Sequence, residues 1–122
     1  MQSLPCNAIV FRAMARKNWI DATTGNVLPA AFLRRPPPAD VDGLSVDVES
    51  ARSCFLVLNK CHGVASLHVG RVRDLGLDIV TDEMPHANIT GLPLGTENVT
   101  LAERLASQLA KQARLVAPER YS

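Results

Sequence analysis

The chain contains few aromatic residues: one tryptophan, one tyrosine and three phenylalanines among 122 residues. Its core must therefore consist mainly of valine, leucine, isoleucine and alanine, and stacking of nucleic-acid bases on aromatic side chains is poorly supported. Charge of one sign is also missing, because 13 Lys and Arg residues face 12 Asp and Glu residues for a net charge of +1. Bulk electrostatics therefore predict no strong attraction to nucleic acid, and an anion site would have to be local.

Long apolar runs are absent as well, since no stretch approaches the roughly 18 residues of a membrane span. The N-terminus lacks a basic region followed by a hydrophobic stretch, as a secretory leader would have. The three cysteines are an odd number without a CxxC pair, which argues against a disulfide framework and a four-cysteine zinc site. The sequence predicts a soluble cytoplasmic protein with no membrane association and one domain spanning residues 1–122.

Five segments have the alternation or β-branched composition of strands. Near the end of the first of them stands Arg12, a charge among apolar neighbours. These segments are "NAIVFRAM" (7–14), "GLSVDV" (43–48), "VASLHVGRV" (64–72), "LDIVTDE" (77–83) and "HANITG" (86–91). In the third segment, Gly70 and the arginines beside it indicate that the strand gives way to one helical turn before Gly76. "VLPAAFLRR" (27–35) fits either a strand or a short helix that starts at Pro29.

Two segments have apolar residues at helical spacing. "ESARSCFLVLNKC" (49–61) is predicted to be an amphipathic helix, and "TLAERLASQLAKQARLV" (100–116) a second one that begins with a Thr100-x-x-Glu103 capping box. Because strands follow one another without regular helical crossovers, the sequence predicts an α+β fold. We expect a mostly antiparallel sheet of four to five strands with both helices on one face.

Metal binding and cysteine or serine catalysis find little support in the spacing. Cys54 and Cys61 would lie two turns apart on the first predicted helix, about 10 Å along its axis, so they cannot share a zinc ion. Cys61 would also stand at the C-terminal end of that helix, where the helix dipole disfavours a thiolate. Around Ser45, the stretch "GLSVD" lacks the second glycine of a nucleophile elbow. We therefore predict no metal and no cofactor.

Arginines near strand ends and turns form a candidate anion site. Arg71 and Arg73 are two residues apart, so in an extended segment they would share a face, and arginine suits bidentate binding of phosphate or carboxylate. The simpler interpretation is that the arginines pair with nearby aspartates in weak surface ion pairs. The residues concerned are Arg12, Arg34, Arg35, Arg71 and Arg73, with Asp40, Asp42, Asp47, Asp74 and Asp78 as possible partners.

His86 is the histidine that the sequence favours most for a functional role. In "PHANITG" the alternation places His86 and Asn88 opposite Ala87 and Ile89, toward solvent or into a groove. Such a pair offers hydrogen-bond donors and acceptors side by side, and the glycines that follow would let a ligand approach the backbone. The simpler interpretation is a histidine that satisfies backbone or turn carbonyls.

The stretches "VFRA" and "GLSV", the latter a strand followed by a predicted helix, resemble the opening of ADP-ribosyltransferase-type folds, including toxin-like enzymes. The resemblance covers about a third of the chain and implies that Arg12 and Ser45 hold a nicotinamide dinucleotide. The chain is short for that fold and has no glutamate at the end of a late strand, so His86 or Glu97 would have to replace the catalytic acid. A second likeness is to small bacterial proteins of no assigned activity, and it therefore points to no function. It is carried by the segments "AFLRR", "DGLSV", "LGLDIV" and "PHANITGLP".

Two functional hypotheses follow. The first is a small binding or accessory protein that recognises a partner protein, a second copy of itself or a small anion through a polar sheet face or an exposed edge. Its candidate ligand-binding residues are Arg12, Ser45, Arg71, Arg73, His86 and Asn88. The alternative is a compact nucleotide-using transferase, which requires Arg12, Ser45 and His86 to line one cleft.

Overall fold

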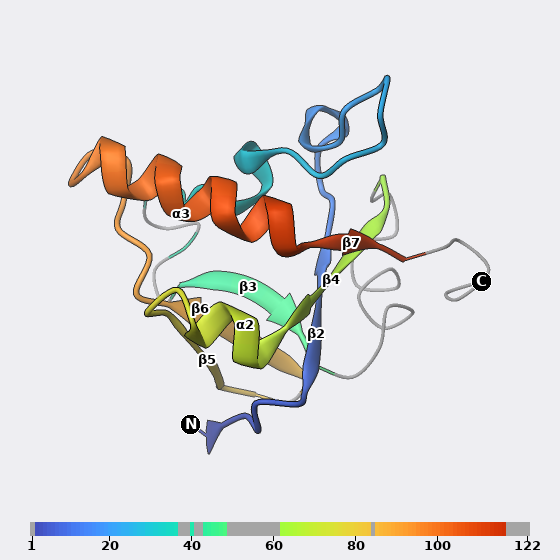
Figure 1. Ribbon diagram of the computed structural model, residues 1–122. Helices are drawn as coiled ribbons and strands as arrows, with labels where there is room; N and C mark the ends of the chain where they lie inside the picture. The colour runs from blue at the N-terminus through green and yellow to red at the C-terminus, as the bar shows by residue number, and fades with distance from the viewer. Residues whose placement is uncertain (1, 37–39, 41–42, 49–61, 84, 117–122) are drawn as a thin grey trace.

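The computed structural model describes residues 2–36, 40, 43–48, 62–83 and 85–116, and these form one antiparallel sheet with helices packed against it (Figure 1). The sheet has seven strands in the order β1-β5-β6-β3-β2-β4-β7. The strands are β1 (Gln2–Ser3), β2 (Ile9–Ala13), β3 (Leu44–Asp47), β4 (Val64–His68), β5 (Asp78–Thr81), β6 (His86–Thr90) and β7 (Arg114–Leu115). The helices of the described residues are α2 (Val69–Arg73), α3 (Val99–Gln112) and two 3-10 helices, η1 (Lys17–Trp19) and η2 (Pro29–Phe32).

One face of the sheet forms the core, and the strand register shows which residues belong to it. Val10 pairs with Leu67, and Ile89 lies between Leu44 and Ile79, so all five side chains share a face. Each of them is 2% exposed or less. Val72 of α2 and Leu109 of α3 belong to the same buried cluster, as does Phe32 of η2. The opposite face carries Ser45, Asp47, His86 and Asn88.

Helix α3 packs against η2 and β4, as its apolar spacing requires. Leu105 and Leu109 are buried, and Leu101 is packed against the core. The predicted capping box is wrong, because the N-cap is Asn98 and its Oδ1 accepts a hydrogen bond from the Leu101 amide at 3.0 Å. Thr100 therefore lies inside the first turn, where it cannot cap the helix.

The α+β class with an antiparallel sheet is confirmed. The expected number of four to five strands is wrong, because the two-residue strands β1 and β7 extend the sheet at both edges and are too short to leave a sequence pattern. At Pro29 the structure has the short helix rather than the strand. The helix predicted over 49–61 lies outside the described residues.

The described helices are shorter than the roughly 20 residues of a membrane-spanning helix. None of them combines the length and apolar composition needed to cross a bilayer.

Candidate functional site

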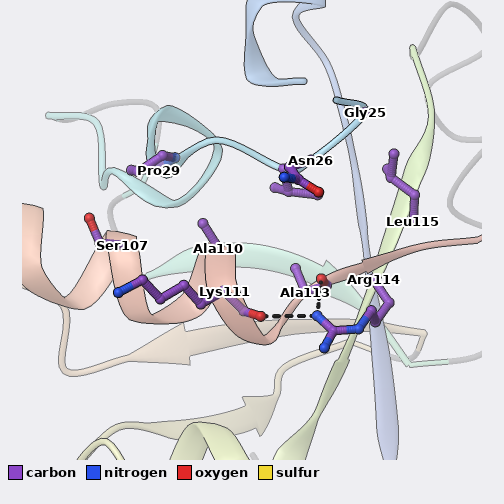
Figure 2. Close-up of a pocket in the computed structure, with 10 residues that line it drawn as sticks. Gly25, Asn26, Pro29, Ser107, Ala110, Lys111, Ala113, Arg114 and Leu115 are labelled. Carbon is purple, nitrogen blue, oxygen red and sulfur yellow. Dashed lines mark hydrogen bonds between the residues drawn. The ribbon is translucent and has the colours of Figure 1, made fainter. Parts of the chain in front are cut away.

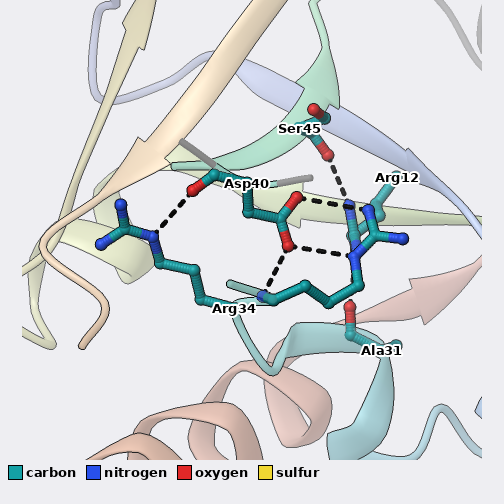
Figure 3. Close-up of polar contacts among 6 residues, drawn as sticks. Arg12, Ala31, Arg34, Asp40 and Ser45 are labelled. Atoms are coloured by element: carbon teal, nitrogen blue, oxygen red, sulfur yellow. Dashed lines mark hydrogen bonds and ion pairs between the residues drawn. The ribbon is translucent and has the colours of Figure 1, made fainter. Parts of the chain in front are cut away.

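The side chain of Arg12 connects β2 to β3 at a point where the two strands separate. β2 and β4 are matched over five residue pairs, whereas β2 and β3 are matched at one, Phe11 with Asp47. Beyond that pair the Arg12 Nη1 donates to the Ser45 carbonyl and its Nε to the Ala31 carbonyl, both at 2.7 Å (Figure 3). Its guanidinium lies 5.0 Å from the centre of the Trp19 ring. Arg12 is 5% exposed, so a buried cation joins β2, β3 and η2.

Asp40 organises two further arginines beside Arg12. Its carboxylate accepts hydrogen bonds from the Arg35 amide (2.7 Å), Nε (3.1 Å) and Nη2 (3.2 Å), while its carbonyl accepts one from Arg34 Nε at 2.9 Å (Figure 3). Burial alone would raise the pKa of Asp40, but the hydrogen bonds from Arg35 and the charges of Arg35 and Arg12 outweigh burial and lower that pKa. The carboxylate is therefore ionised at neutral pH.

His86 is held by the carboxylate of Asp82, a residue that no sequence pattern connects with it. The His86 Nδ1 lies 2.7 and 2.8 Å from the two Asp82 carboxylate oxygens, and Asn88 Nδ2 donates to Asp82 Oδ2 at 3.0 Å. The hydrogen bond with His86 is the largest of the effects that lower the pKa of Asp82 to about 2. An ionised carboxylate only accepts hydrogen bonds, so Nδ1 carries the proton and Nε2 is the nitrogen left for a ligand.

We expect the Asp82–His86 contact to make stability depend on acid pH. The pKa of Asp82 lies below its ordinary value of 3.8 in the folded chain, so its contribution is complete above about pH 4 and is lost as the pH falls toward about 2. In urea unfolding, Asp82→Asn should therefore lower the free energy of unfolding at neutral pH and differ little from wild type near pH 2. Glu83→Gln, at the exposed neighbour, should show no such pH-dependent difference. An equal loss for Asp82→Asn at both pH values would contradict the assignment.

Arg12, Ser45 and His86 line one open cavity of about 290 Å³, which we call the Trp19 cavity. It lies where β2 and β3 separate, and its other functional-group and aromatic lining residues are Phe11, Trp19, Arg35 and Asp47. Cations, a carboxylate, a hydroxyl, an imidazole and two aromatic rings thus meet in one place. The volume is at the small end of ligand pockets.

No pattern in the sequence connects Trp19 and Phe11 with the residues of this cavity. Trp19 lies in η1, after β2 has ended, and reaches the cavity only because η1 folds over the Arg12 guanidinium. The one available signal was that Trp19 is the single tryptophan of a chain with few aromatic residues. Asp47 follows Ser45 by two residues, and the two-residue period of a strand places both on one face.

Asn88, Arg71 and Arg73 lie outside the residues that line the Trp19 cavity. The sequence places Asn88 toward solvent or into a groove; in the structure Asn88 is 4% exposed and its amide donates to Asp82. Gly91, in the turn after β6, packs against Leu77 rather than offering space to a ligand.

Arg71 and Arg73 lie in α2, so the extended segment that would have aligned them does not form. Arg73 Nε pairs with Asp78 at 2.9 Å, its Nη1 contacts the Cys6 sulfur at 3.1 Å, and its Nη2 donates to the Leu4 carbonyl. Both arginines nevertheless line a second, wide-open cavity of about 480 Å³ with Cys6 and His68. Arg73 thus ties α2 to β5 and to the N-terminal segment.

A larger cavity of about 590 Å³ lies between the loop at Gly25–Pro29 and the C-terminal end of α3 (Figure 2). Its arginine, Arg114, donates from Nη1 to the carbonyls of Lys111 and Ala113, both at 3.0 Å. Basic side chains commonly bind the last carbonyls of a helix in this way, so the charge of Arg114 serves the end of α3.

The described ranges contain several residue types that can bind metal ions. They contain no group of three or more His, Cys, Asp or Glu side chains placed to hold a metal ion. Cys54 and Cys61, which the sequence analysis discussed, lie outside those ranges.

The chain matches no protein-family model, no curated protein and no solved structure. Its function therefore has to be inferred from the geometry of the site.

Proposed function

We propose that the protein binds a small anionic ligand, one that also carries a planar or apolar group, in the Trp19 cavity. The observation that carries this proposal is the meeting of Arg12, Ser45 and His86, from three different strands, in one cavity. A ligand pocket typically combines an apolar wall with a few convergent polar groups, and this cavity has both. Phe11 and Trp19 supply the apolar wall.

Arg35 is the cation best placed to meet the anionic group. Its Nε and Nη2 are bound to Asp40, which fixes the plane of the guanidinium and leaves Nη1 for a ligand. The side chain is 44% exposed, so a ligand can reach it from solvent. Arg12 adds positive charge to the wall of the cavity. Because its guanidinium donates to two backbone carbonyls, its main role is to shape the cavity.

The edges of the sheet support a partner protein or a homodimer less well. The edge strands β1 and β7 have two residues each, and short edge strands offer few unpaired backbone groups to an added strand. We therefore place recognition at the Trp19 cavity rather than at a sheet edge.

A fluorescence titration tests the proposal, because the single tryptophan of the chain lies in the cavity wall. Inorganic phosphate, nucleoside monophosphates, NAD and aromatic carboxylates would be titrated separately. We expect at least one of them to change the Trp19 emission saturably. Arg35→Gln should weaken that ligand about 10- to 100-fold, because a hydrogen bond to a charged group contributes about 1.5–3 kcal/mol.

Arg104→Gln is the matched control, since Arg104 is exposed on α3 and does not line the cavity. It should bind the ligand as the wild type does. Equal weakening by both variants would indicate nonspecific attraction and contradict the proposal, as would the absence of saturable binding by every compound.

A nucleotide-using transferase is the second candidate, and one observation favours it: Arg12 and Ser45 line the same cavity as His86. Glu97 does not support it, because its carboxylate accepts a hydrogen bond from the Leu94 amide in the turn before α3, and it is not a lining residue. The titration separates the two candidates. NAD as the tightest ligand, with release of nicotinamide, would favour the transferase.

A further inference from the structure

We propose that the Trp19 cavity is an active site that hydrolyses small esters, with Ser45 as nucleophile, His86 as general base and Asp82 as the residue that orients His86. This inference rests on the proposed function, because the substrate would occupy the same cavity. It adds a covalent reaction that binding alone does not require.

The first support is the way His86 is held. Asp82 binds Nδ1 with both carboxylate oxygens, and Asn88 donates a further hydrogen bond to Asp82 Oδ2. A histidine whose Nδ1–H is bound to a carboxylate presents Nε2 as a proton acceptor, which is the arrangement of the base in serine hydrolases. The low pKa of Asp82 keeps that carboxylate ionised, so it can stabilise the imidazolium that forms during the reaction.

The second support is the position of Ser45 relative to His86. In the ladder between β3 and β6, Ser45 pairs with Asn88 and Asp47 pairs with His86, so Ser45 and His86 are diagonal neighbours on one face. Diagonal neighbours have Cβ atoms roughly 7 Å apart, within reach of a long side chain such as histidine. Both residues line the Trp19 cavity.

The third support is the state of the Ser45 side chain. Ser45 is exposed, and its hydroxyl makes no hydrogen bond to any described residue, His86 included, so the contact between Oγ and Nε2 has to form when a substrate enters the cavity. Its carbonyl is held by Arg12 at 2.7 Å, which fixes the backbone that carries the hydroxyl. A glycine elbow exposes the nucleophile of many hydrolases. Here the strand does so, since a residue on the non-core face at a gap in the sheet already points away from the core.

The reaction has two steps. In the first, His86 Nε2 takes the proton of the Ser45 hydroxyl while Oγ bonds to the ester carbonyl carbon. The bond to the leaving alcohol then breaks, and the alcohol takes the proton from Nε2. In the second, water gives a proton to Nε2 and attacks the acyl group; the bond to Oγ breaks, the proton returns to Oγ, and a carboxylic acid is released.

The charges of the cavity determine which esters would fit. Arg35 would accept an anionic group of the substrate, and an arginine near the carbonyl oxygen can stabilise the negative charge that develops there. The predicted substrate class is a small ester with an anionic acyl part.

The experiment uses the full chain and phenylmethylsulfonyl fluoride, a reagent that sulfonylates activated serines. We expect one sulfonyl group per chain by mass spectrometry, on the peptide that contains Ser45, and slow hydrolysis of p-nitrophenyl acetate that the reagent abolishes. Ser45→Ala should remove both labelling and hydrolysis. His86→Gln should reduce hydrolysis about 10²- to 10⁴-fold, the range for loss of a general base.

Ser66→Ala is the control, because Ser66 lies on the same sheet in β4 but is not a residue of the cavity; it should label and hydrolyse as the wild type does. Labelling that persists in Ser45→Ala, or no labelling at all, would overturn the proposal. The Trp19 titration is run on the same samples. Ligand binding without labelling would leave the binding function standing and remove the esterase, whereas loss of binding alone would remove the proposed ligand.

Discussion

Arg12→Met should lower the free energy of unfolding by about 2–5 kcal/mol. Methionine keeps much of the length of the side chain but leaves the Ala31 and Ser45 carbonyls without their donor, and an unsatisfied buried polar group costs roughly 1–3 kcal/mol. Ala31 is fully buried, so water cannot easily replace the lost hydrogen bond there. Urea unfolding followed by circular dichroism measures the difference.

Arg104→Met provides the reference, because Arg104 is exposed on α3 and its replacement should change stability by no more than about 0.5 kcal/mol. Arg12→Lys should fall between the two, since an ammonium group keeps the charge but cannot donate to both carbonyls in the fixed fork of a guanidinium. A loss for Arg12→Met as small as for Arg104→Met would show that β2 and β3 are held together by other contacts.

Asp40→Asn should cost about 1.5–3 kcal/mol at neutral pH, the range for hydrogen bonds to a charged group. The asparagine keeps the shape of the side chain but removes the charge that Arg35 pairs with and that Arg12 lies near. Asp40 is 2% exposed, so water cannot easily replace the lost hydrogen bonds. Unfolding in urea at several pH values is the measurement.

The pH dependence of this variant has a defined sign. Because the pKa of Asp40 is lowered in the folded chain, its stabilising contribution is present above its ordinary value of 3.8 and is lost as the pH falls through the folded pKa. The difference between wild type and Asp40→Asn should therefore shrink in acid. Asp74→Asn, at an exposed aspartate, is the control. A pH-independent difference for Asp40→Asn would mean that the charge of Asp40 does not stabilise the folded chain.

The strands and α3 were predictable because their patterns are local. Alternation along "GLSVDV" and "HANITG" and the leucine spacing after Thr100 report directly which side chains face a core. The cap at Asn98 was missed because the boundary of a helix depends on one hydrogen bond, and both Asn98 and Thr100 are good capping residues.

The site was predictable only in part, for reasons that are specific to its contacts. A charge within an apolar strand needs a partner, which draws attention to Arg12, but its partners include two backbone carbonyls, which no sequence pattern can reveal. Asp82 follows β5 and meets His86 across the turn to β6, so the pair exists only once the hairpin has formed. Alternation indicates that Asn88 lies on the non-core face but cannot decide between solvent and a groove, because it gives the direction of a side chain and not what covers it.

The single residue pair between β2 and β3 divides the sheet into two leaves, β1-β5-β6-β3 and β2-β4-β7. Neighbouring strands within each leaf are paired over several residues or along a short edge strand. The described contacts across the seam include the Phe11–Asp47 pair and the hydrogen bond from Arg12 to the Ser45 carbonyl. The Trp19 cavity lies on that seam and takes residues from both leaves. A molecule bound there would contact both leaves, and by linkage its binding free energy would add to the free energy of unfolding of the whole sheet.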